Sequence, residues 1–464
     1  DVLYHSIKDL PVDGIDYEYA TSSTQIRSFS SSSSLHDFLV PFFDSEQELN
    51  EYENKIPTLS IFVPKLPLNS FSAESWDTSD ESQTPDVALR LDNITPVPVI
   101  GSDGENYIIE PEDTPAYPIV VLKENERVIS SNAKGFDDYD TRIMRTRIFS
   151  FRFIDNLFDP EFNLITTNPT SFSGASDDSI PNDLKSAYNL FANDPYAWHR
   201  DNIYYGLTPT NTSGPINGGK YREYIATFKL IASSPKKAYD MVSDSFNEEK
   251  EDPKLRDSWQ RRRHGVSAWT DGHYEFSIKC SQGAKASHLG PSANRGFAAS
   301  AEDLFEIEWE RKDTGWWIWK KVYLKPKITK VKTLNTAVPN GLRLEFSTWD
   351  LNNFSNHWKF AFSEKDAAET VTLKETRSAK YNTNFDFNPT TGNLEKIGLK
   401  LGGSYETSRT SEFTVAYTAG DDGLKHTDVN FYDNPLSKEN GKFILRKFST
   451  GRVEFSLVPV QVQF

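Results

Sequence analysis

The stretch Tyr274-Glu275-Phe276-Ser277-Ile278-Lys279-Cys280 alternates apolar and polar side chains over its whole length. A period of two places the apolar side chains on one face of an extended strand and the polar ones on the other. Similar strand patterns cover Tyr221–Ile231, Leu304–Glu310 and Trp316–Leu324. The last two flank the turn-forming sequence Lys312-Asp313-Thr314-Gly315 and are predicted to form a hairpin. The middle of the chain is therefore predicted to consist largely of antiparallel strands.

The last third of the sequence continues this pattern with almost no helical signal. Its strand-like segments are Ile328–Leu334, Leu342–Thr348, Trp358–Phe362, Thr370–Glu375, Phe385–Phe387, Ile397–Leu401, Glu412–Thr418, Asp428–Tyr432, Phe443–Lys447 and Val453–Val458. Many short strands at regular spacing are typical of an antiparallel sandwich or barrel. We predict a mainly β fold with a few short helices, built from antiparallel β-sandwich modules and an elongated C-terminal β domain.

The first third combines one helical segment with short strands. Apolar residues recur at three- and four-residue spacing within Ser34–Lys55, and Pro41 is expected to kink or split this helix. Further helices are predicted at Asp183–Asn193 and Ser234–Asp244, where a Ser-Pro pair supplies the N-cap and the first helical residue. Strands are predicted at Leu59–Pro64, Asp86–Leu91, Tyr107–Ile109 and Tyr117–Leu122.

These patterns divide the chain into three predicted modules. Residues 1–130 form an acidic β-rich module with one helix. Residues 131–325 form a mixed, sandwich-like central module with short helices, and residues 326–464 form an all-β module with a Ser/Thr-rich hairpin. Lys325-Pro326-Lys327 is predicted to be the linker between the last two modules.

Charge is distributed unevenly along the 464 residues, whose formal net charge is -16. Residues 1–140 carry 8 basic and 27 acidic side chains, whereas the remainder carries 43 basic and 40 acidic ones. An acidic surface repels the phosphate backbone, so we expect no nucleic-acid partner. No apolar run approaches the roughly 18 residues of a transmembrane helix. The sequence begins at Asp1, which is compatible with a processed, exported chain.

Familiar catalytic and metal-binding patterns are missing from the sequence. Cys280 is the only cysteine, so an intrachain disulfide and a cysteine-based metal site are excluded. The eight histidines are scattered, and His199 is interpreted as a structural residue in preference to an acid–base partner of Asp201. The acidic clusters at residues 137–140 and 177–178 lack a calcium-loop pattern. We expect no enzyme activity, no metal and no cofactor, although the two carboxylates of a glycosidase need no motif.

Two groups of residues are candidates for a binding role. A cluster of tryptophans could stack on a glycan, although clustered Trp in strands more often packs between sheets. These candidate binding residues are Trp269, Trp316, Trp317 and Trp319. The second group lies in a Ser/Thr-rich stretch with alternating polarity, which could act as a membrane-spanning hairpin over residues 397–432 or as an exposed edge hairpin of a soluble sandwich. Its candidate membrane-facing residues are Tyr405, Phe413, Val415, Tyr417, Val429 and Phe431.

Two resemblances bear on function. Pro57–Pro64, Val87–Arg90, Ile119–Arg127 and Arg200–Pro209 make the chain similar to uncharacterised surface lipoproteins of the Bacteroidetes kind, over most of its length. This resemblance implies export and surface display. The Ser/Thr-rich hairpin of the last third resembles the insertion region of aerolysin-like β-pore formers, and this second resemblance implies oligomerisation and membrane insertion.

We therefore hypothesise a secreted or surface-exposed, non-enzymatic binding protein, located outside the cell or on a bacterial outer surface. Its partner would be a cell-surface glycan, a protein or a lipid membrane, and homo-oligomers are possible. The first alternative is an aerolysin-like pore-forming toxin that oligomerises and inserts a hairpin from residues 397–432. The second alternative is a carbohydrate-active hydrolase.

Overall fold

The computed structural model describes most of the chain from residue 40 onward. The described residues are 40–56, 58–77, 79–91, 96–110, 113–125, 128–132, 144–145, 149–153, 168–169, 179–192, 198–206, 208, 213–215, 220–243, 253–254, 266–285, 290–314, 321–335, 344–350, 354, 356–364, 371–381, 385–388, 393–397, 409–419 and 423–463. Strands dominate this part of the chain, and the few helices are short. The predicted fold class, mainly β with several antiparallel sheets, is confirmed.

The described helices are η1 (Val40–Phe42), α3 (Glu46–Lys55), η2 (Pro67–Asn69), η3 (Glu81–Gln83), α4 (Asn182–Leu190), α5 (His199–Tyr205), α6 (Pro235–Val242), η6 (Ala268–Thr270) and α7 (Ala301–Leu304). Four of the described helices, α3, η3, α6 and α7, begin at a residue whose side chain caps the helix. At α6, the Ser234 side chain accepts a hydrogen bond from the backbone N–H of Lys237, and Pro235 is the first helical residue, as predicted. Around Pro41 the predicted helix is split, because η1 ends before Ser45 begins α3.

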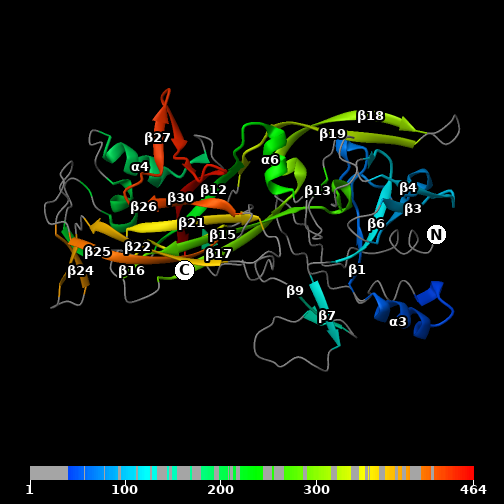
Figure 1. Ribbon diagram of the computed structural model, residues 1–464, viewed down its shortest axis with the longest axis horizontal. Coiled ribbons are helices and arrows are strands. Elements are labelled where there is room, and N and C mark those ends of the chain that lie inside the picture. The colour runs from blue at the N-terminus through cyan, green and yellow to red at the C-terminus, as the bar shows by residue number, and fades with distance from the viewer. Residues whose placement is uncertain are drawn as a thin grey trace.

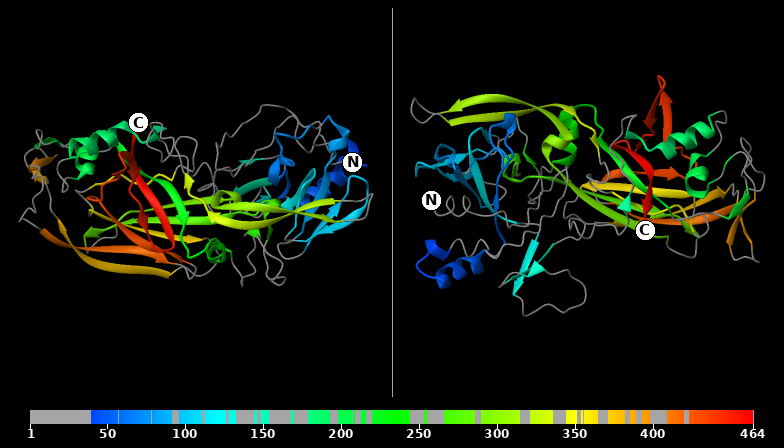
Figure 2. Two further views of the ribbon diagram at one scale, coloured as in Figure 1. Left: turned by 90° about the horizontal axis from the view of Figure 1, so that it is seen from above. Right: turned by 180° about the vertical axis from the view of Figure 1, so that it is seen from behind.

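The molecule is elongated (Figures 1 and 2), and its two ends differ in architecture. One end holds a five-stranded sheet, here called the N-terminal sheet. In spatial order its strands are β1 (Leu59–Phe62), β6 (Ile119–Glu124), β2 (Asp86–Arg90), β3 (Val97–Ile100) and β4 (Asn106–Ile109). Only β2 and β6 run parallel. The inner face of this sheet packs on Leu66, Phe71, Trp269 and Tyr323 in a hydrophobic cluster of its own.

The other part of the molecule is a sandwich of two sheets. The first contains β10 (Asn168–Pro169), β30 (Val453–Gln463), β12 (Tyr221–Leu230) and β20 (Leu334–Asn335), with β29 (Phe448–Ser449) paired to β30. The second contains β17 (Ser292–Ala299), β15 (Tyr274–Gln282), β21 (His357–Glu364) and β26 (Gly423–Asn430). Strands from the predicted central and C-terminal modules thus pair within both sheets, and one core extends from Ile180 to Val460.

Aromatic rings fill the space between the two sheets. The ring of Phe228 on β12 lies 5.0 Å from that of Phe276 on β15, and Phe455 on β30 lies 4.8 Å from Phe362 on β21. All four side chains are buried. The alternation seen in Tyr274–Cys280 therefore marks the core-facing side of a central strand, because its apolar residues Tyr274, Phe276, Ile278 and Cys280 are all buried and its polar residues are half-buried.

A long hairpin joins the N-terminal sheet to the sandwich. Its strands are β18 (Phe305–Thr314) and β19 (Lys321–Val331), and β5 (Thr114–Pro115) pairs with β19. The predicted linker Lys325-Pro326-Lys327 lies within β19, opposite Glu310, Trp309 and Glu308. The linker prediction is therefore wrong. Proline is tolerated here because β5 pairs with β19 only at Tyr323 and Leu324, which leaves Pro326 on an edge.

The described strands between residues 357 and 430 form nested pairs, here called the ribbon. The outer pair is β21 with β26, the middle pair is β22 (Val371–Tyr381) with β25 (Arg409–Ala419), and the inner pair is β23 (Phe385–Asn388) with β24 (Asn393–Ile397). The outer pair joins the ribbon to the sandwich, because β21 pairs with β15. Two short strands make further attachments: β16 (Ala284–Lys285) pairs with β25, and β11 (Ser213–Pro215) pairs with β24.

The remaining described strands form small sheets. They are β7 (Val128–Asn132), β8 (Met144–Arg145), β9 (Phe149–Phe153), β13 (Pro253–Lys254), β14 (Val266–Ser267), β27 (Leu436–Glu439) and β28 (Lys442–Leu445). The predicted strand at Arg145–Ile154 corresponds to β8 and β9. The segment predicted as a strand at Leu342–Thr348 contributes an isolated bridge between Glu345 and Tyr224.

Candidate functional site

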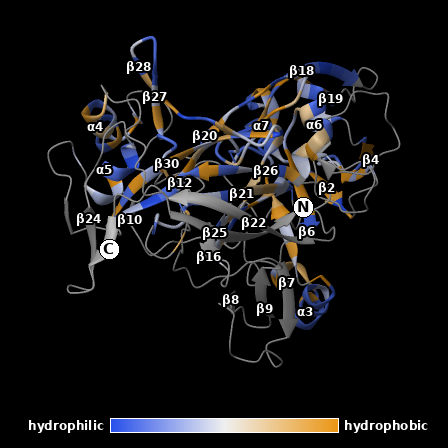
Figure 3. Cartoon of the chain, turned by 60° about the vertical axis from the view of Figure 1, so that its left-hand side comes forward, coloured by the Kyte–Doolittle hydropathy of each residue, from blue (hydrophilic) through white to orange (hydrophobic). Residues whose placement is uncertain are grey.

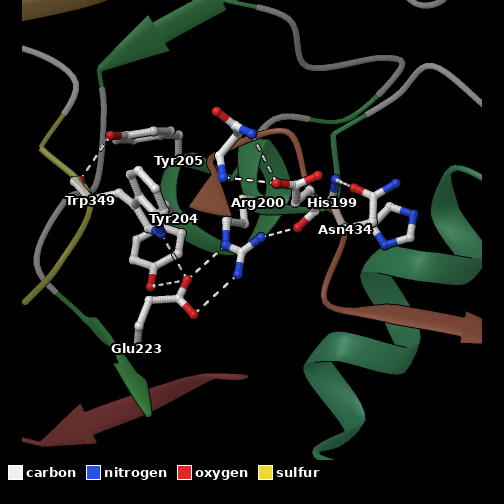
Figure 4. A network of polar contacts seen from close by, with 9 residues as sticks. His199, Arg200, Tyr204, Tyr205, Glu223, Trp349 and Asn434 are labelled. Carbon is white, nitrogen blue, oxygen red and sulfur yellow. Dashed lines mark hydrogen bonds and ion pairs between the residues drawn. The ribbon is translucent and has the colours of Figure 1, made fainter. Parts of the chain in front are cut away.

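A network of buried polar side chains surrounds Glu223 on β12 (Figure 4). Arg200 on α5 donates to both carboxylate oxygens, from Nε at 2.7 Å and from Nη2 at 3.2 Å. Tyr204 Oη and Trp349 Nε1 each donate to Glu223 Oε1 at 2.9 Å. Arg200 and Glu223 are both 0% exposed. These donors replace the water that burial removes from the carboxylate, so the charge is compensated inside the protein.

This network holds together segments that are distant in the sequence. Arg200 Nη1 also donates to the backbone carbonyl of Asp433, in the turn that follows β26. The Asp433 side chain accepts a hydrogen bond from the Asn430 backbone N–H at 2.8 Å. Helix α5 is therefore tied both to β12 and to the base of the ribbon. A fully buried carboxylate cannot meet a substrate, so Glu223 serves the architecture.

His199 lies beside this network and is 5% exposed. Its ring packs against those of Tyr188 and Phe191, with centroids 5.3 Å and 6.4 Å away. Burial, together with the nearby charge of Arg200, lowers the pKa of His199 to about 4. The imidazole is therefore neutral at pH 7, and its burial is consistent with the interpretation of His199 as a structural residue.

Cys280 is buried in β15, and burial, together with the charge of Glu223, raises the pKa of its thiol well above the usual range. A thiol in this state is a poor nucleophile, because only the thiolate attacks. Among the described residues, no group of three or more His, Cys, Asp or Glu side chains could hold a metal ion. The acidic clusters at 137–140 and 177–178 lie outside the described residues.

Of the four candidate tryptophans, Trp269 is the one that lies within the described residues. Trp269 is 5% exposed, belongs to the cluster beneath the N-terminal sheet, and donates from Nε1 to the carbonyl oxygen of Asp113 at 3.1 Å. Trp316, Trp317 and Trp319 lie outside the described residues. The position of Trp269 thus corresponds to the packing role that the sequence left open, and its indole N–H joins η6 to the loop before β5.

The predicted membrane hairpin does not form one pair of strands. β25 pairs with β22, whereas β26 pairs with β21 in a different sheet. Val429 and Phe431 are 0% exposed and belong to the core of the sandwich. Within the described part of the chain, residues 397–432 are therefore divided between two sheets.

The other hairpin candidates lie on β25 or beyond the described residues. In the register of the ribbon, Tyr417 pairs with Leu373, Val415 with Glu375, and Phe413 with Arg377. Tyr405 falls outside the described residues. Only the first of these three pairs is apolar in both partners, so the alternation seen along β25 is not matched along β22.

An apolar surface that the sequence reading missed covers the outer face of the N-terminal sheet. The register brings the following side chains onto this face: Leu59, Ile61, Val87, Leu89, Pro98, Ile100, Asn106, Ile108, Val120, Leu122 and Glu124. All but Asn106 and Glu124 are apolar. Leu59, Ile100 and Ile108 are 53%, 46% and 62% exposed, and Leu91, directly after β2, is 74% exposed.

The other apolar residues of this face are less accessible, because Ile61, Val87, Leu89, Pro98 and Leu122 are half-buried and Val120 is buried. Exposed apolar side chains gathered on one face of a sheet are candidates for an interaction site. Figure 3 shows the hydrophobic colouring of β2 and β4. The sequence signal was the lack of alternation: Ile119-Val120-Val121-Leu122 and Val97-Pro98-Val99-Ile100 are apolar at both parities. Such strands are usually covered on both faces. The acidic residues Asp103, Glu105, Glu110 and Glu124 are exposed around this surface.

No described helix is both long and apolar enough to cross a membrane. Comparison with known protein families, curated proteins and solved structures finds no match to this chain.

Proposed function

We propose that the chain is a non-enzymatic binding protein that acts at a cell surface, and that the outer face of the N-terminal sheet is its contact surface. The observation that carries this proposal is the exposure of Leu59, Ile100, Ile108 and Leu91 on one apolar face of the sheet. Interfaces combine an apolar centre with a polar rim. The rim here is acidic, so the partner is a protein with an apolar patch and basic residues around it.

Binding of the fluorescently labelled chain to intact cells tests this function. Wild-type chain should bind saturably, and protease treatment of the cells should abolish binding whereas glycosidase treatment should not. Ile108→Asp should weaken binding roughly tenfold or more, because it places a charge among the exposed apolar side chains of the contact surface. Leu190→Asp, at the exposed end of α4, is the matched control and should bind like wild type. Equal binding of both variants, or binding that survives protease, would contradict the proposal.

A second candidate function is membrane insertion of the ribbon after oligomerisation. The nested pairing of β22 with β25 and of β23 with β24 favours it, because strands that are already paired with one another can move together as one unit. The buried positions of Val429 and Phe431 limit the movable part to residues 371–419. This segment ends at residue 419, whereas the hairpin expected from the sequence ends at residue 432.

Two cysteine pairs that share one position distinguish this candidate from simple binding. Thr414 pairs with Ala284 in β16 and with Thr376 in β22. Oxidised Ala284→Cys/Thr414→Cys would tie the ribbon to the sandwich, whereas oxidised Thr376→Cys/Thr414→Cys would tie the ribbon only to itself. Dye release from liposomes should be lost in the first variant, kept in the second, and restored to the first by a reducing agent. If the wild-type chain releases no dye and forms no detergent-resistant oligomer, the insertion proposal is wrong.

A further inference from the structure

The N-terminal sheet is attached to the β18–β19 hairpin by charged side chains. Lys312 Nζ lies 2.5 Å from Asp113 Oδ2, and Lys321 Nζ lies 2.5 Å from Asp86 Oδ2. In both pairs the carboxylate belongs to the acidic module and the ammonium group to the hairpin. The pair formed by Lys321 and Asp86 makes further contacts with aromatic side chains.

The ammonium group of Lys321 sits between two aromatic rings. Its Nζ lies 4.1 Å from the ring centroid of Tyr107 and 4.9 Å from that of Tyr117. Tyr107 Oη donates to Asp86 Oδ2 at 2.5 Å and lies 2.9 Å from Tyr117 Oη. The Ser102 backbone N–H donates to Asp86 Oδ1 at 2.7 Å. A fixed carboxylate and two ring faces are the groups that recognise an organic cation.

The residues that build this cage come from one side of the junction. Asp86 lies on β2, Tyr107 lies on β4, and Tyr117 precedes β6, so all three belong to the acidic module. Two of the hydrogen bonds that orient Asp86 come from within this module and do not depend on Lys321. The module therefore carries the recognition chemistry. The hairpin supplies the cation and Tyr323, which accepts a hydrogen bond from Tyr117 Oη at 3.5 Å and packs edge-on against its ring.

Solvent reaches the cage from the side of the lysine. The Asp86 side chain is 5% exposed, whereas the Lys321 side chain is 28% exposed. Lys321 is the first residue of β19 and pairs with Thr314, the last residue of β18, so it stands at the end of the part of the hairpin that the structure describes. An ammonium group on an alkyl chain could take the place of Lys321 without crossing the hydrophobic cluster.

We propose that Asp86, Tyr107 and Tyr117 form a recognition site for a primary alkylammonium group, that is, for a lysine side chain, and that Lys321 occupies this site as an internal ligand. A lysine presented by a partner protein would compete with Lys321 and loosen the hairpin from the acidic module. This site lies on the inner side of the N-terminal sheet, so the inference goes beyond the proposed contact surface on the outer face and stands or falls separately from it.

Chemical replacement of the lysine tests the proposal. Lys321→Ala removes the side chain, and n-butylammonium supplies a four-carbon stem with the same charged group. We expect Lys321→Ala to have a lower melting temperature than wild type, and saturating n-butylammonium to raise it by roughly 2 °C or more. Butanol, which has the stem without the charge, should not raise it.

Two matched variants complete the experiment. Lys330→Ala removes a lysine from the same strand whose ammonium is paired with the exposed Glu306, and its melting temperature should not respond selectively to n-butylammonium. Lys321→Met keeps the site filled and should not respond either. If Lys321→Ala folds poorly, its yield on refolding with and without n-butylammonium gives the same comparison. A response equal to that of Lys330→Ala, or no response, would overturn the proposal.

Discussion

Two clusters in this molecule each hold a carboxylate against a cationic side chain and a tyrosine, but the cationic side chains differ in exposure. Around Glu223, a carboxylate accepts hydrogen bonds from an arginine and a tyrosine, and both charged side chains are 0% exposed. Around Asp86, a carboxylate accepts hydrogen bonds from a lysine and a tyrosine, but the Lys321 side chain is 28% exposed. The first cluster lies within one core, whereas the second joins two units of the fold.

The difference in burial separates a permanent contact from an exchangeable one. Arg200 meets Glu223 with two parallel hydrogen bonds, a geometry that lysine cannot reproduce. Separating this pair inside the core would leave two charges without water or partner. Lys321 is a compact charge on a flexible stem and is partly exposed, so another ammonium group can take its place beside Asp86.

The largest effect is expected when the buried cluster is broken. Glu223→Gln keeps the shape of the side chain but leaves Arg200 buried without a counter-charge, and should lower the free energy of unfolding by about 3–5 kcal/mol. Urea denaturation followed by tryptophan fluorescence measures this loss. A double-mutant cycle with Arg200→Met should show strong coupling between the two positions. Additive effects of the two substitutions would contradict the assignment of this pair as the anchor.

Acidification should also destabilise the region around the Glu223 cluster, because His199 lies beside it. Its pKa is about 4 in the folded chain and 6.5 in the unfolded chain, so the unfolded state binds more protons between these values. Stability is therefore complete above pH 6.5 and falls as the pH drops towards 4, by about 3 kcal/mol in all. Denaturation curves at several pH values measure this loss. His199→Phe keeps a ring between Tyr188 and Phe191 and should flatten the curve in this window; an unchanged slope would assign the loss to other groups.

A smaller and more local effect is expected at the exchangeable cluster. Burial alone would raise the pKa of Asp86, but hydrogen bonds from Lys321, Tyr107 and Ser102 outweigh it and hold this pKa below its usual value of 3.8. The stability that Asp86 contributes is thus present above pH 3.8 and is lost as the pH falls below it. Asp86→Asn should cost about 1–3 kcal/mol at pH 7.

Hydrogen exchange shows where the Asp86→Asn loss occurs. Faster exchange should be confined to β5 and the facing end of β19, while β12 and β30 keep the protection of wild type. Faster exchange throughout the sandwich would mean that the two clusters are not independent.

The smallest effect is expected where an ion pair is open to water on both sides. Lys330 and Glu306 lie 2.8 Å apart with side chains 66% and 50% exposed. Lys330→Ala should change the free energy of unfolding by no more than about 0.5 kcal/mol, measured by the same urea denaturation. A larger loss would show that the exposure of an ion pair does not determine how much it contributes to the stability of this protein.

Local features of the fold were within reach of the sequence. Ser234 and Pro235 begin α6 as predicted, and the alternation in Tyr274–Cys280 marks the central strand β15. Four strands of the acidic module, β1, β2, β4 and β6, were also recognised, with ends that differ by one or two residues, whereas β3 and β5 were missed. These signals depend only on caps, turns and side-chain period, which act over a few residues.

The pairing of strands that are distant in the sequence could not be predicted from local patterns. Pro326 was interpreted as a break because proline disrupts central strands, yet it lies on an edge of β19. β25 was expected to turn back onto β26, but each strand pairs with an earlier partner in a different sheet. The apolar outer face of the N-terminal sheet was missed because single strands do not show which of their two faces is covered.

By itself, the sequence determined the strand-rich fold class, the acidity of the first third, and the lack of familiar catalytic and metal motifs, because composition and short-range periodicity carry this information. Only the tertiary structure decided that Arg200 meets Glu223, that Lys321 enters a cage formed by Asp86, Tyr107 and Tyr117, and that the ribbon is nested. The Arg200–Glu223 contact joins residues 23 positions apart, and the Lys321–Asp86 contact joins residues 235 positions apart. Which residues meet in these contacts depends on how whole sheets pack against one another. A local pattern of side chains does not contain this information.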